Sequence, residues 1–276
     1  MKLGLIGETL GHSLSPCIHR KIFGRLGISG TYDLVEIGKG EWQERMEQAL
    51  ASYDGLNVTI PYKTAVIPFL DEISEEARRI GAVNTIAVRN GKIKGYNTDY
   101  AGFSRTLRKI GAEVSGRRCV VLGSGGASRA VIQCLSDEGA DVSVISRHPE
   151  NLGEDFISFA HRCGAKIYSY GTLEWNPHGT LLVNTTPVGM FPHAGVSPVS
   201  PRVAGAFPKV IDIIYNPKET ELLSHAKTAD RANGMYMLVM QAVAAEEIWT
   251  GAAIPPAVAE AVAEEMENGA VHGRHS

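Results

Sequence analysis

The sequence has few cysteines, no long apolar run and no excess of charge of either sign, and each absence excludes a class of protein. Four cysteines in 276 residues, with no CxxC spacing, indicate unpaired thiols in a reducing compartment rather than a disulfide framework or zinc site. No stretch approaches the roughly 18 apolar residues of a membrane helix, and the N-terminal apolar run is too short for a signal peptide. A net charge of −3 argues against a nucleic-acid partner. We therefore expect a cytoplasmic protein that binds small molecules, without a metal and without a membrane or nucleic-acid partner.

What is present is a globular composition, 44% apolar and 21% charged, arranged as two α/β units in series. Strands over 2–6, 31–37 and 55–60 alternate with helices over 15–26 and 41–51, which predicts a parallel βαβαβ unit. Short helices over 62–70 and 74–80 follow. Strands over 83–89 and 92–96 flank Asn90-Gly91, the turn chemistry of a hairpin. A helix over 100–110 leads into the second unit, and the boundary falls near residue 101.

The second unit begins with an apolar strand, a glycine turn and a helix over 119–135. Gly123, Gly125 and Gly126 let the backbone approach a bound group, and free N–H groups at the helix start suit a phosphate. Ser128 replaces the third glycine of the usual GxGxxG, so the turn alone fits a dinucleotide site and an ordinary strand–helix connection about equally. Strands over 141–146, 165–169, 180–184 and 209–214, with helices over 152–162 and 220–228, favour a Rossmann-like doubly wound sheet. Two further helices are expected over 235–250 and 255–266.

The end of the second strand of this sheet indicates which dinucleotide binds. NAD-binding proteins carry an acidic residue there, whereas this chain has Ser146 followed by Arg147. A guanidinium can pair with a 2′-phosphate that a carboxylate would repel, so NADP is favoured over NAD. Arg129, in the first turn of the preceding helix, is a second candidate for that pocket. The alternative is that Arg147 is a solvated surface residue.

The first unit carries polar side chains where a ligand site is expected. Asn57, Thr59 and Lys63 lie in the segment that ends a parallel strand, and ligands of open α/β sheets bind beyond the carboxyl ends of the strands. A partly desolvated lysine can donate a proton or stabilise a developing alkoxide. The other polar residues have simpler interpretations: Ser15 is expected as the N-cap of a helix with Pro16 at its first position, and Asp99 could equally be an N-cap.

Taken together, these segments resemble one family. The sequence is similar to shikimate dehydrogenases over about residues 2–251, through eight motifs in the same order: Ser13-Leu-Ser-Pro16, Asn57-Val-Thr-Ile-Pro-Tyr-Lys63, Gly81-Ala-Val-Asn-Thr85, Asn97-Thr-Asp99, Gly123-Ser-Gly-Gly-Ala-Ser-Arg129, Asn184-Thr-Thr-Pro-Val-Gly-Met190, Asp212-Ile-Ile-Tyr-Asn-Pro217 and Gly234-Met-Tyr-Met-Leu-Val-Met-Gln241. The resemblance implies reversible NADPH-dependent reduction of 3-dehydroshikimate to shikimate, a step of aromatic amino-acid biosynthesis. It also implies a substrate-binding domain over 1–101, an NADP-binding domain over 102–234, a cleft between them, and C-terminal helices over 235–276 that return to the substrate domain.

The same resemblance assigns roles to individual positions. It makes Lys63 and Asp99 the catalytic pair. The substrate set comprises Ser13, Ser15, Thr59, Lys63, Asn84, Asp99, Tyr215 and Gln241. The cofactor set comprises Gly123, Ser124, Gly125, Gly126, Ala127, Arg129, Ser146, Arg147, Thr186, Met190 and Gly234. Serine hydroxyls suit the carboxylate of shikimate, and amide and carboxylate groups suit its hydroxyls, so an analogue that lacks a hydroxyl is expected to be rejected.

Two departures from the family pattern bear on the cofactor and leave alternatives open. Asn151, beside Glu150, stands where many members have a second arginine, so the preference for NADP is expected to be weaker than usual. Tyr236 stands where some members have glycine, with no predicted consequence. A quinate/shikimate dehydrogenase of broader substrate and cofactor use is the nearer alternative, and a non-catalytic dinucleotide-binding regulator is the more distant one. A monomer and a homodimer are both compatible with the sequence.

Overall fold

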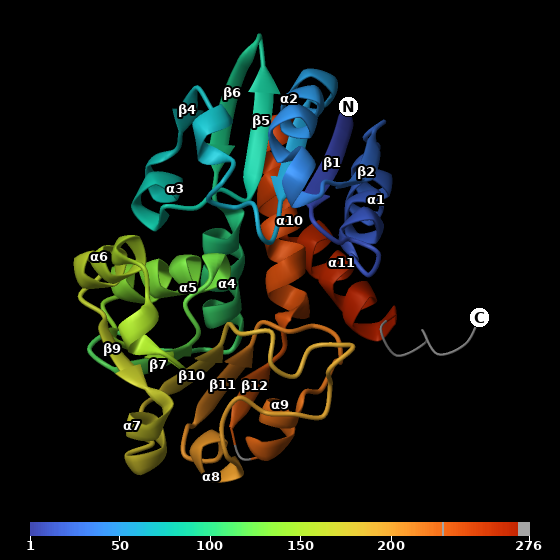
Figure 1. Ribbon diagram of the computed structural model, residues 1–276. Helices are drawn as coiled ribbons and strands as arrows, with labels where there is room; N and C mark the ends of the chain where they lie inside the picture. The colour runs from blue at the N-terminus through green and yellow to red at the C-terminus, as the bar shows by residue number, and fades with distance from the viewer. Residues whose placement is uncertain (228, 270–276) are drawn as a thin grey trace. The chain divides into compact units, whose positions relative to one another are not determined.

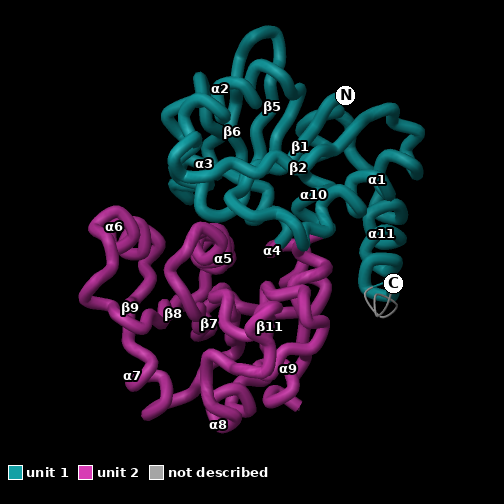
Figure 2. Tube along the Cα trace, turned by 45° about the vertical axis from the view of Figure 1, so that its right-hand side comes forward, with its two compact units in different colours: residues 1–102, 239–276 teal, residues 103–238 magenta. Residues whose placement is uncertain are grey.

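The computed structural model describes residues 1–227 and 229–269, and the chain forms two compact units. Unit 1 takes Met1–Gly102 and the chain from Val239 onward, and unit 2 is Phe103–Leu238 (Figure 2). Both units are α/β, as predicted. The C-terminal segment expected over 235–276 includes residues 270–276, which lie outside the described residues.

Unit 1 is built on a six-stranded sheet in the order β2-β1-β3-β5-β6-β4. Its strands are β1 (Lys2–Gly7), β2 (Thr31–Glu36), β3 (Gly55–Val58), β4 (Glu72–Ile73), β5 (Thr85–Arg89) and β6 (Lys92–Tyr96). The first three pair in parallel, which confirms the βαβαβ prediction. β5 and β6 form the predicted antiparallel hairpin, and both turn residues have positive φ, 51° at Asn90 and 75° at Gly91. This is the conformation that an Asn-Gly turn requires.

The helices of unit 1 come from both ends of the chain: α1 (Ser15–Leu26), α2 (Trp42–Ser52), α3 (Glu75–Ile80), most of α10 (Gly234–Thr250) and α11 (Pro256–Gly269), with 3₁₀ turns η1 (Lys39–Glu41) and η2 (Ile67–Phe69) (Figure 1). The helix predicted over 62–70 is wrong. Residues 61–66 form turns and only η2 is helical, because Pro68 has no N–H to continue an α-helical ladder.

Two helix starts also differ from the predictions. Ser15 is the first residue of α1, and its own N–H donates to the Ser13 hydroxyl at 3.3 Å, so Ser15 is not a capping residue. Asp99 lies inside α4 (Thr98–Lys109), and the residue before that helix, Asn97, accepts the N–H of Tyr100 at 3.4 Å. Neither Ser15 nor Asp99 is therefore an N-cap residue.

Unit 2 has a wholly parallel sheet in the order β12-β11-β10-β7-β8-β9. Its strands are β7 (Arg118–Leu122), β8 (Asp141–Ser146), β9 (Lys166–Ser169), β10 (Leu181–Asn184), β11 (Lys209–Asp212) and β12 (Asp230–Ala232). Numbered from β7, this is the doubly wound dinucleotide-binding order 3-2-1-4-5-6. The strand order reverses between β7 and β10, the place where such sheets bind their ligand.

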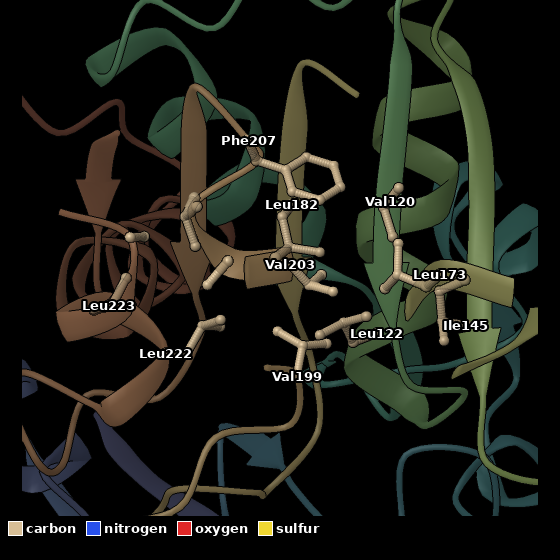
Figure 3. Packing of buried hydrophobic residues seen from close by; sticks show 13 residues of the cluster. Val120, Leu122, Ile145, Leu173, Leu182, Val199, Val203, Phe207, Leu222 and Leu223 are labelled. Carbon is tan, nitrogen blue, oxygen red and sulfur yellow. The ribbon is translucent and has the colours of Figure 1, made fainter. Parts of the chain in front are cut away.

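The helices of unit 2 are most of α4, α5 (Gly126–Asp137), α6 (Glu154–Arg162), α7 (Tyr170–Trp175), α8 (Pro201–Ala204) and α9 (Glu221–His225), with η3 (Pro149–Asn151). The helix predicted over 220–228 is shorter, and residue 228 lies outside the described residues. Figure 3 shows the side chains of Val120, Leu182 and Phe207 packed with those of α8 and α9, all of them buried. Burial on this scale holds the strand ends, and so the loops that follow them, in place.

Candidate active site

The centre of the candidate site in unit 1 is an ion pair between Lys63 and Asp99. Lys63 lies in the turn after β3, where its carbonyl accepts the Val83 N–H at 2.7 Å, and Asp99 lies in the first turn of α4. Lys63 Nζ donates to Asp99 Oδ2 at 2.5 Å, and the side chains are only 13% and 10% exposed. A helix N-terminus favours the carboxylate, which in turn holds the ammonium of a lysine largely removed from water. The arrangement presents one proton-carrying group in a fixed place.

Asn84 and Gln241 meet at a buried threonine beside this pair. Asn84 Oδ1 accepts the N–H of Thr98 at 2.7 Å, and the Thr98 hydroxyl donates to Gln241 Oε1 at 3.4 Å. All three residues are buried. The structure thus brings Lys63, Asn84, Asp99 and Gln241 onto adjoining elements, from four separate motifs of the sequence.

Sequence analysis assigned no role to Thr85 and Thr98, which hold Asn84. Thr85 and Thr98 are buried and share a hydrogen bond between their hydroxyls at 2.9 Å, and each hydroxyl also contacts Asn84 Oδ1. Asn57 donates to the Thr85 hydroxyl at 3.0 Å. These residues stood in the motifs, and polar side chains within buried strands, Asn57 in β3 and Thr85 in β5, were the signal that could have identified this network.

The remaining substrate candidates of unit 1 lie near the ends of β1 and β3. Ser15 is 6% exposed, whereas Ser13 and Thr59 are half-buried. The Thr59 N–H donates to Ile6 O at 2.8 Å, so its backbone continues the sheet. Within the described chain, no hydrogen bond joins Ser13 to the Lys63–Asp99 pair. Their common membership of one site is a prediction.

In unit 2 the glycine turn after β7 has the geometry of a phosphate-binding loop. Gly123 has φ 107°, and a Cβ there would lie 2.9 Å from Thr185 Oγ1, so only glycine fits. Gly125 precedes α5, and a Cβ at this position would meet no atom within 4 Å. Ser128, at the position of the missing third glycine, donates to Gly125 O at 2.6 Å and so closes the turn. The open side of Gly125 and the free N–H groups of α5 suit a pyrophosphate.

The two candidate readers of a 2′-phosphate have different surroundings. Arg147, after β8, is exposed and makes no hydrogen bond or ion pair to the residues that the structure describes. Arg129 is 8% exposed, pairs with Asp155 Oδ2 at 2.5 Å and lies over the rings of Phe156 and Phe159. Its charge is already partnered within the protein. Arg147 is therefore the better placed of the two to meet a phosphate.

A buried carboxylate organises the loops that hold Thr186 and Tyr215. Asp212, fully buried at the end of β11, accepts from Asn184 Nδ2 at 3.0 Å, Thr220 Oγ1 at 2.7 Å and the Ile214 N–H at 3.1 Å. Burial raises its pKa to about 6, against the smaller lowering effect of these hydrogen bonds. Asn184 Oδ1 in turn accepts from the N–H and hydroxyl of Thr186. One acid thus fixes two strand-end loops.

The other unit 2 candidates lie on these loops or next to them. Met190 is 43% exposed, and Tyr215 is half-buried with its pKa raised by burial. The Gly234 N–H donates to Ile214 O at 2.9 Å, and a Cβ at Gly234 would overlap the backbone of Ile213. The loop after β11 therefore lies against the start of α10.

The described residues contain no group of three or more His, Cys, Asp and Glu side chains that could hold a metal ion. Among the helices that the structure describes, none combines the length and apolarity needed to cross a bilayer.

A Rossmann-like unit with a glycine turn, in one chain with a second α/β unit that holds a largely buried Lys–Asp pair, defines a two-domain dinucleotide-dependent oxidoreductase. The chain belongs to the shikimate dehydrogenase family. The family model described as the shikimate dehydrogenase substrate binding domain matches residues 5–86. A shikimate dehydrogenase (NADP(+)) of Clostridium perfringens is 42% identical over 273 residues, 97% of this chain and 99% of the relative.

Solved structures agree with this assignment. The chorismate mutase/shikimate 5-dehydrogenase fusion protein of Clostridium acetobutylicum has a TM-score of 0.91 and 44% identity, and the match covers 98% of each chain. Shikimate 5-dehydrogenase of Thermus thermophilus, in complex with NADP(H) and shikimate, has a TM-score of 0.84 and 32% identity. This match covers 96% of the present chain and 99% of the other.

Proposed function

We propose that this chain is an NADP-dependent oxidoreductase that interconverts 3-dehydroshikimate and shikimate. The observation that carries the proposal is the largely buried Lys63–Asp99 ion pair, next to the Thr98 hydroxyl that joins the amides of Asn84 and Gln241. Such groups suit a polyhydroxylated acid. Curated relatives at 42% identity bear the name of this activity, and the Thermus thermophilus structure contains both ligands. In this assignment unit 1 binds the substrate and unit 2 binds NADP.

The residues of unit 1 divide the substrate between them. The hydroxyls of Ser13 and Ser15 bind the carboxylate, and Thr59, Asn84 and Gln241 bind ring hydroxyls together with Asp99; Tyr215 of unit 2 completes the set. Asn84 and Gln241 are buried and held through Thr98, so a substrate that lacks the matching hydroxyl would leave buried amides unpaired. This accounts for selection of a polyol acid.

Lys63 and Asp99 carry out the proton step. Reduction leaves negative charge on the former carbonyl oxygen, and the Lys63 ammonium stabilises and protonates that oxygen. In the reverse direction the lysine amine takes the proton of the shikimate hydroxyl. Asp99 holds Nζ in place at 2.5 Å, so that little reorganisation is needed when the charge develops.

NADPH supplies the hydride when it is bound, and the residues of unit 2 fit this cofactor. Gly123, Ser124, Gly125, Gly126 and Ala127 form the pyrophosphate turn, and the open space at Gly125 agrees with that role. Ser146 and Arg147 meet the adenosine ribose and its 2′-phosphate, while Thr186, Met190 and Gly234 lie near the nicotinamide. Because Arg129 is paired with Asp155, we assign it a supporting role at this pocket.

All the proposed site residues belong to one chain, so the activity requires no second subunit and can be carried by a monomer or a homodimer. We infer that it works in the cytoplasm, where the substrate pathway and reduced thiols are expected. The four described cysteines form no disulfide with one another, which agrees with a reducing compartment.

The decisive experiment compares shikimate and quinate as substrates, each with NADP+ and with NAD+. We expect shikimate with NADP+ to give the largest kcat/KM of the four combinations. A larger value with quinate would favour the broader quinate/shikimate enzyme. No oxidation of either substrate, with NADP+ binding retained, would favour a dinucleotide-binding regulator.

A further inference from the structure

Three polar residues without an assigned role lie buried in unit 1 next to the proposed substrate residues. His19 of α1 and Glu246 of α10 are fully buried, and Tyr32 of β2 is 9% exposed. His19 Nδ1 lies 2.6 Å from Glu246 Oε1, although the residues are 227 positions apart in the sequence. Their second polar atoms, His19 Nε2 and Glu246 Oε2, have no hydrogen-bond partner among the described residues. A hydrophobic pair would stabilise such a place as well or better, so the polar pair calls for another explanation.

Tyr32 connects this pair to the substrate residues. Its ring stacks on that of His19 with centroids 3.9 Å apart and planes 10° from parallel. Its hydroxyl donates to Asn57 Oδ1 at 2.7 Å, and the Ser15 side chain lies close enough to the same hydroxyl to lower its pKa. Burial, reinforced by the charge of Glu246, raises the Tyr32 pKa well above its usual value against the lowering effect of Ser15. The phenol therefore keeps its proton at neutral pH and remains a donor to Asn57.

The bond from Tyr32 determines which way the Asn57 amide faces. Since Oδ1 accepts from Tyr32, Nδ2 faces Asn84 O at 3.2 Å and Thr85 Oγ1 at 3.0 Å. The Thr85 hydroxyl contacts Asn84 Oδ1 at 3.1 Å. An unbroken series of buried hydrogen bonds thus runs from Tyr32 to the amide of Asn84, and each bond restricts the next.

We propose that Tyr32, held by the His19–Glu246 pair, is a positioning residue for the substrate. It orients the Ser15 hydroxyl on one side and the Asn84 amide on the other. His19 and Ser15 are four residues apart in α1 and so share a helix face, which means that fixing the ring of His19 also fixes the turn that carries Ser15. This inference rests on the proposed function, in which Ser15 and Asn84 bind shikimate.

The test is Tyr32→Phe, which keeps the stacked ring and removes the hydroxyl. We expect KM for shikimate to rise about tenfold, since two oriented polar groups lose their common partner, while KM for NADP+ stays within about twofold. The matched control is Tyr53→Phe. The Tyr53 hydroxyl donates to Asp33 Oδ2 at 3.1 Å, and Asp33 is the residue after Tyr32 in β2. None of the proposed site residues takes part in this hydrogen bond. Both Michaelis constants should be unchanged in the control.

A double-mutant cycle with Ser15→Ala distinguishes positioning from general destabilisation. Because Tyr32 is proposed to act partly through Ser15, the double variant should lose much less affinity for shikimate than the product of the two single losses. Glu246→Gln keeps the shape of the pair but removes its charge, and it should raise KM for shikimate severalfold without changing KM for NADP+.

Three results would overturn the proposal: an unchanged KM for shikimate in Tyr32→Phe despite a lower Tm, an equal rise in both Michaelis constants, or full additivity with Ser15→Ala. Failure of the proposed function would look different, because the wild-type enzyme would then fail to oxidise shikimate with NADP+ at all.

Discussion

At the scale of single residues, the catalytic role proposed for the Lys63–Asp99 pair is the first to test. Replacing Lys63 by alanine removes the only proton-carrying group assigned to the reacting oxygen. General acid–base assistance is worth about 10²–10⁴-fold, so kcat for shikimate oxidation should fall by that order while the Kd for shikimate changes far less. Steady-state kinetics and calorimetric titration with shikimate measure the two effects separately.

The control for that variant is Lys94→Ala. Lys94 is also in unit 1 and is 40% exposed, and its ammonium pairs with Glu72 at 3.5 Å on the β4–β6 side of the sheet. This variant should keep wild-type turnover. Near-normal turnover in Lys63→Ala would show that another group or a water carries the proton.

Asp212 makes the stability of the protein depend on pH. Its pKa is raised from 3.8 in the unfolded chain to about 6 in the folded protein, so the folded state binds its proton more tightly. The corresponding contribution to stability is fully present below pH 3.8 and is lost as the pH rises through about 6. A difference of roughly two pKa units corresponds to about 3 kcal/mol.

Asp212→Asn tests this contribution because an asparagine amide can keep the contacts without the charge. Its oxygen can accept from Asn184 and Ile214, and its NH₂ can donate to Thr220. Relative to wild type, the variant should gain up to about 3 kcal/mol of unfolding free energy between pH 4 and pH 7.5, measured by urea denaturation at both pH values. A constant difference between the two proteins would show that Asp212 has an ordinary pKa.

Residue pairs distant in sequence mark the limit of what could be predicted at this scale. Lys63 and Asp99 were joined only through a family resemblance, since nothing in their local sequence indicates a 2.5 Å contact across 36 positions. The His19–Glu246 pair was missed because no motif contains both residues. Arg129 was a second candidate for the 2′-phosphate pocket, and nothing in the sequence indicated its ion-pair partner, Asp155 of the next helix. Which side chains become partners depends on tertiary packing, and local sequence patterns do not determine that packing.

At the scale of elements, local chemistry was sufficient where one turn decided the structure. The Asn90-Gly91 hairpin and the strand–turn–helix at Gly123–Gly126 were predicted because their glycines and asparagine are demanded by backbone geometry. Prediction failed over 62–70, where apolar spacing resembled a helix but Pro68 prevented one. It also omitted β4, β12, α7 and α8, which have two to six residues and form through contacts with neighbouring elements.

The glycine turn permits a test that separates cofactor binding from folding. Gly125→Ala places a methyl group in open space at ordinary φ, so it should cost only about 1 kcal/mol or less of stability as a weaker N-cap. If the pyrophosphate lies against this turn, the same methyl should raise KM for NADPH about tenfold or more by excluding the backbone approach.

The companion variant Gly123→Ala should lower stability as well. At φ 107°, and with Thr185 Oγ1 2.9 Å from the added Cβ, the alanine is strained whether or not cofactor is present. Thermal unfolding and NADPH kinetics on both variants provide the comparison. An unchanged KM in Gly125→Ala would place the pyrophosphate elsewhere.

At the scale of the whole molecule, the chain leaves unit 1 within α4, builds unit 2, and returns within α10. Unit 1 depends on that return. Trp249 of α10 donates to Ile86 O at 2.8 Å. A Cβ at Gly55 of β3 would overlap the Trp249 indole, so α10 packs directly against the sheet only because residue 55 is glycine. Residues near both ends of the chain therefore contribute to one core, and unit 1 cannot be completed until the last helices are made.

Substrate and cofactor are assigned to different units. Each ligand should therefore still stabilise the protein when a residue that binds the other ligand is replaced. A ligand at 100 times its Kd adds about 2.7 kcal/mol, which corresponds to a rise in Tm of roughly 5–10 °C for units of this size. In Arg147→Ala the shift in Tm produced by NADP+ should largely disappear while the shift produced by shikimate remains, and Ser15→Ala should show the reverse.

The control for loss of charge is Arg162→Ala. Arg162 is an exposed arginine at the end of α6, and this variant should keep both shifts. Differential scanning fluorimetry with each ligand alone gives the result, and loss of both shifts in either site variant would contradict the assignment of one ligand to each unit.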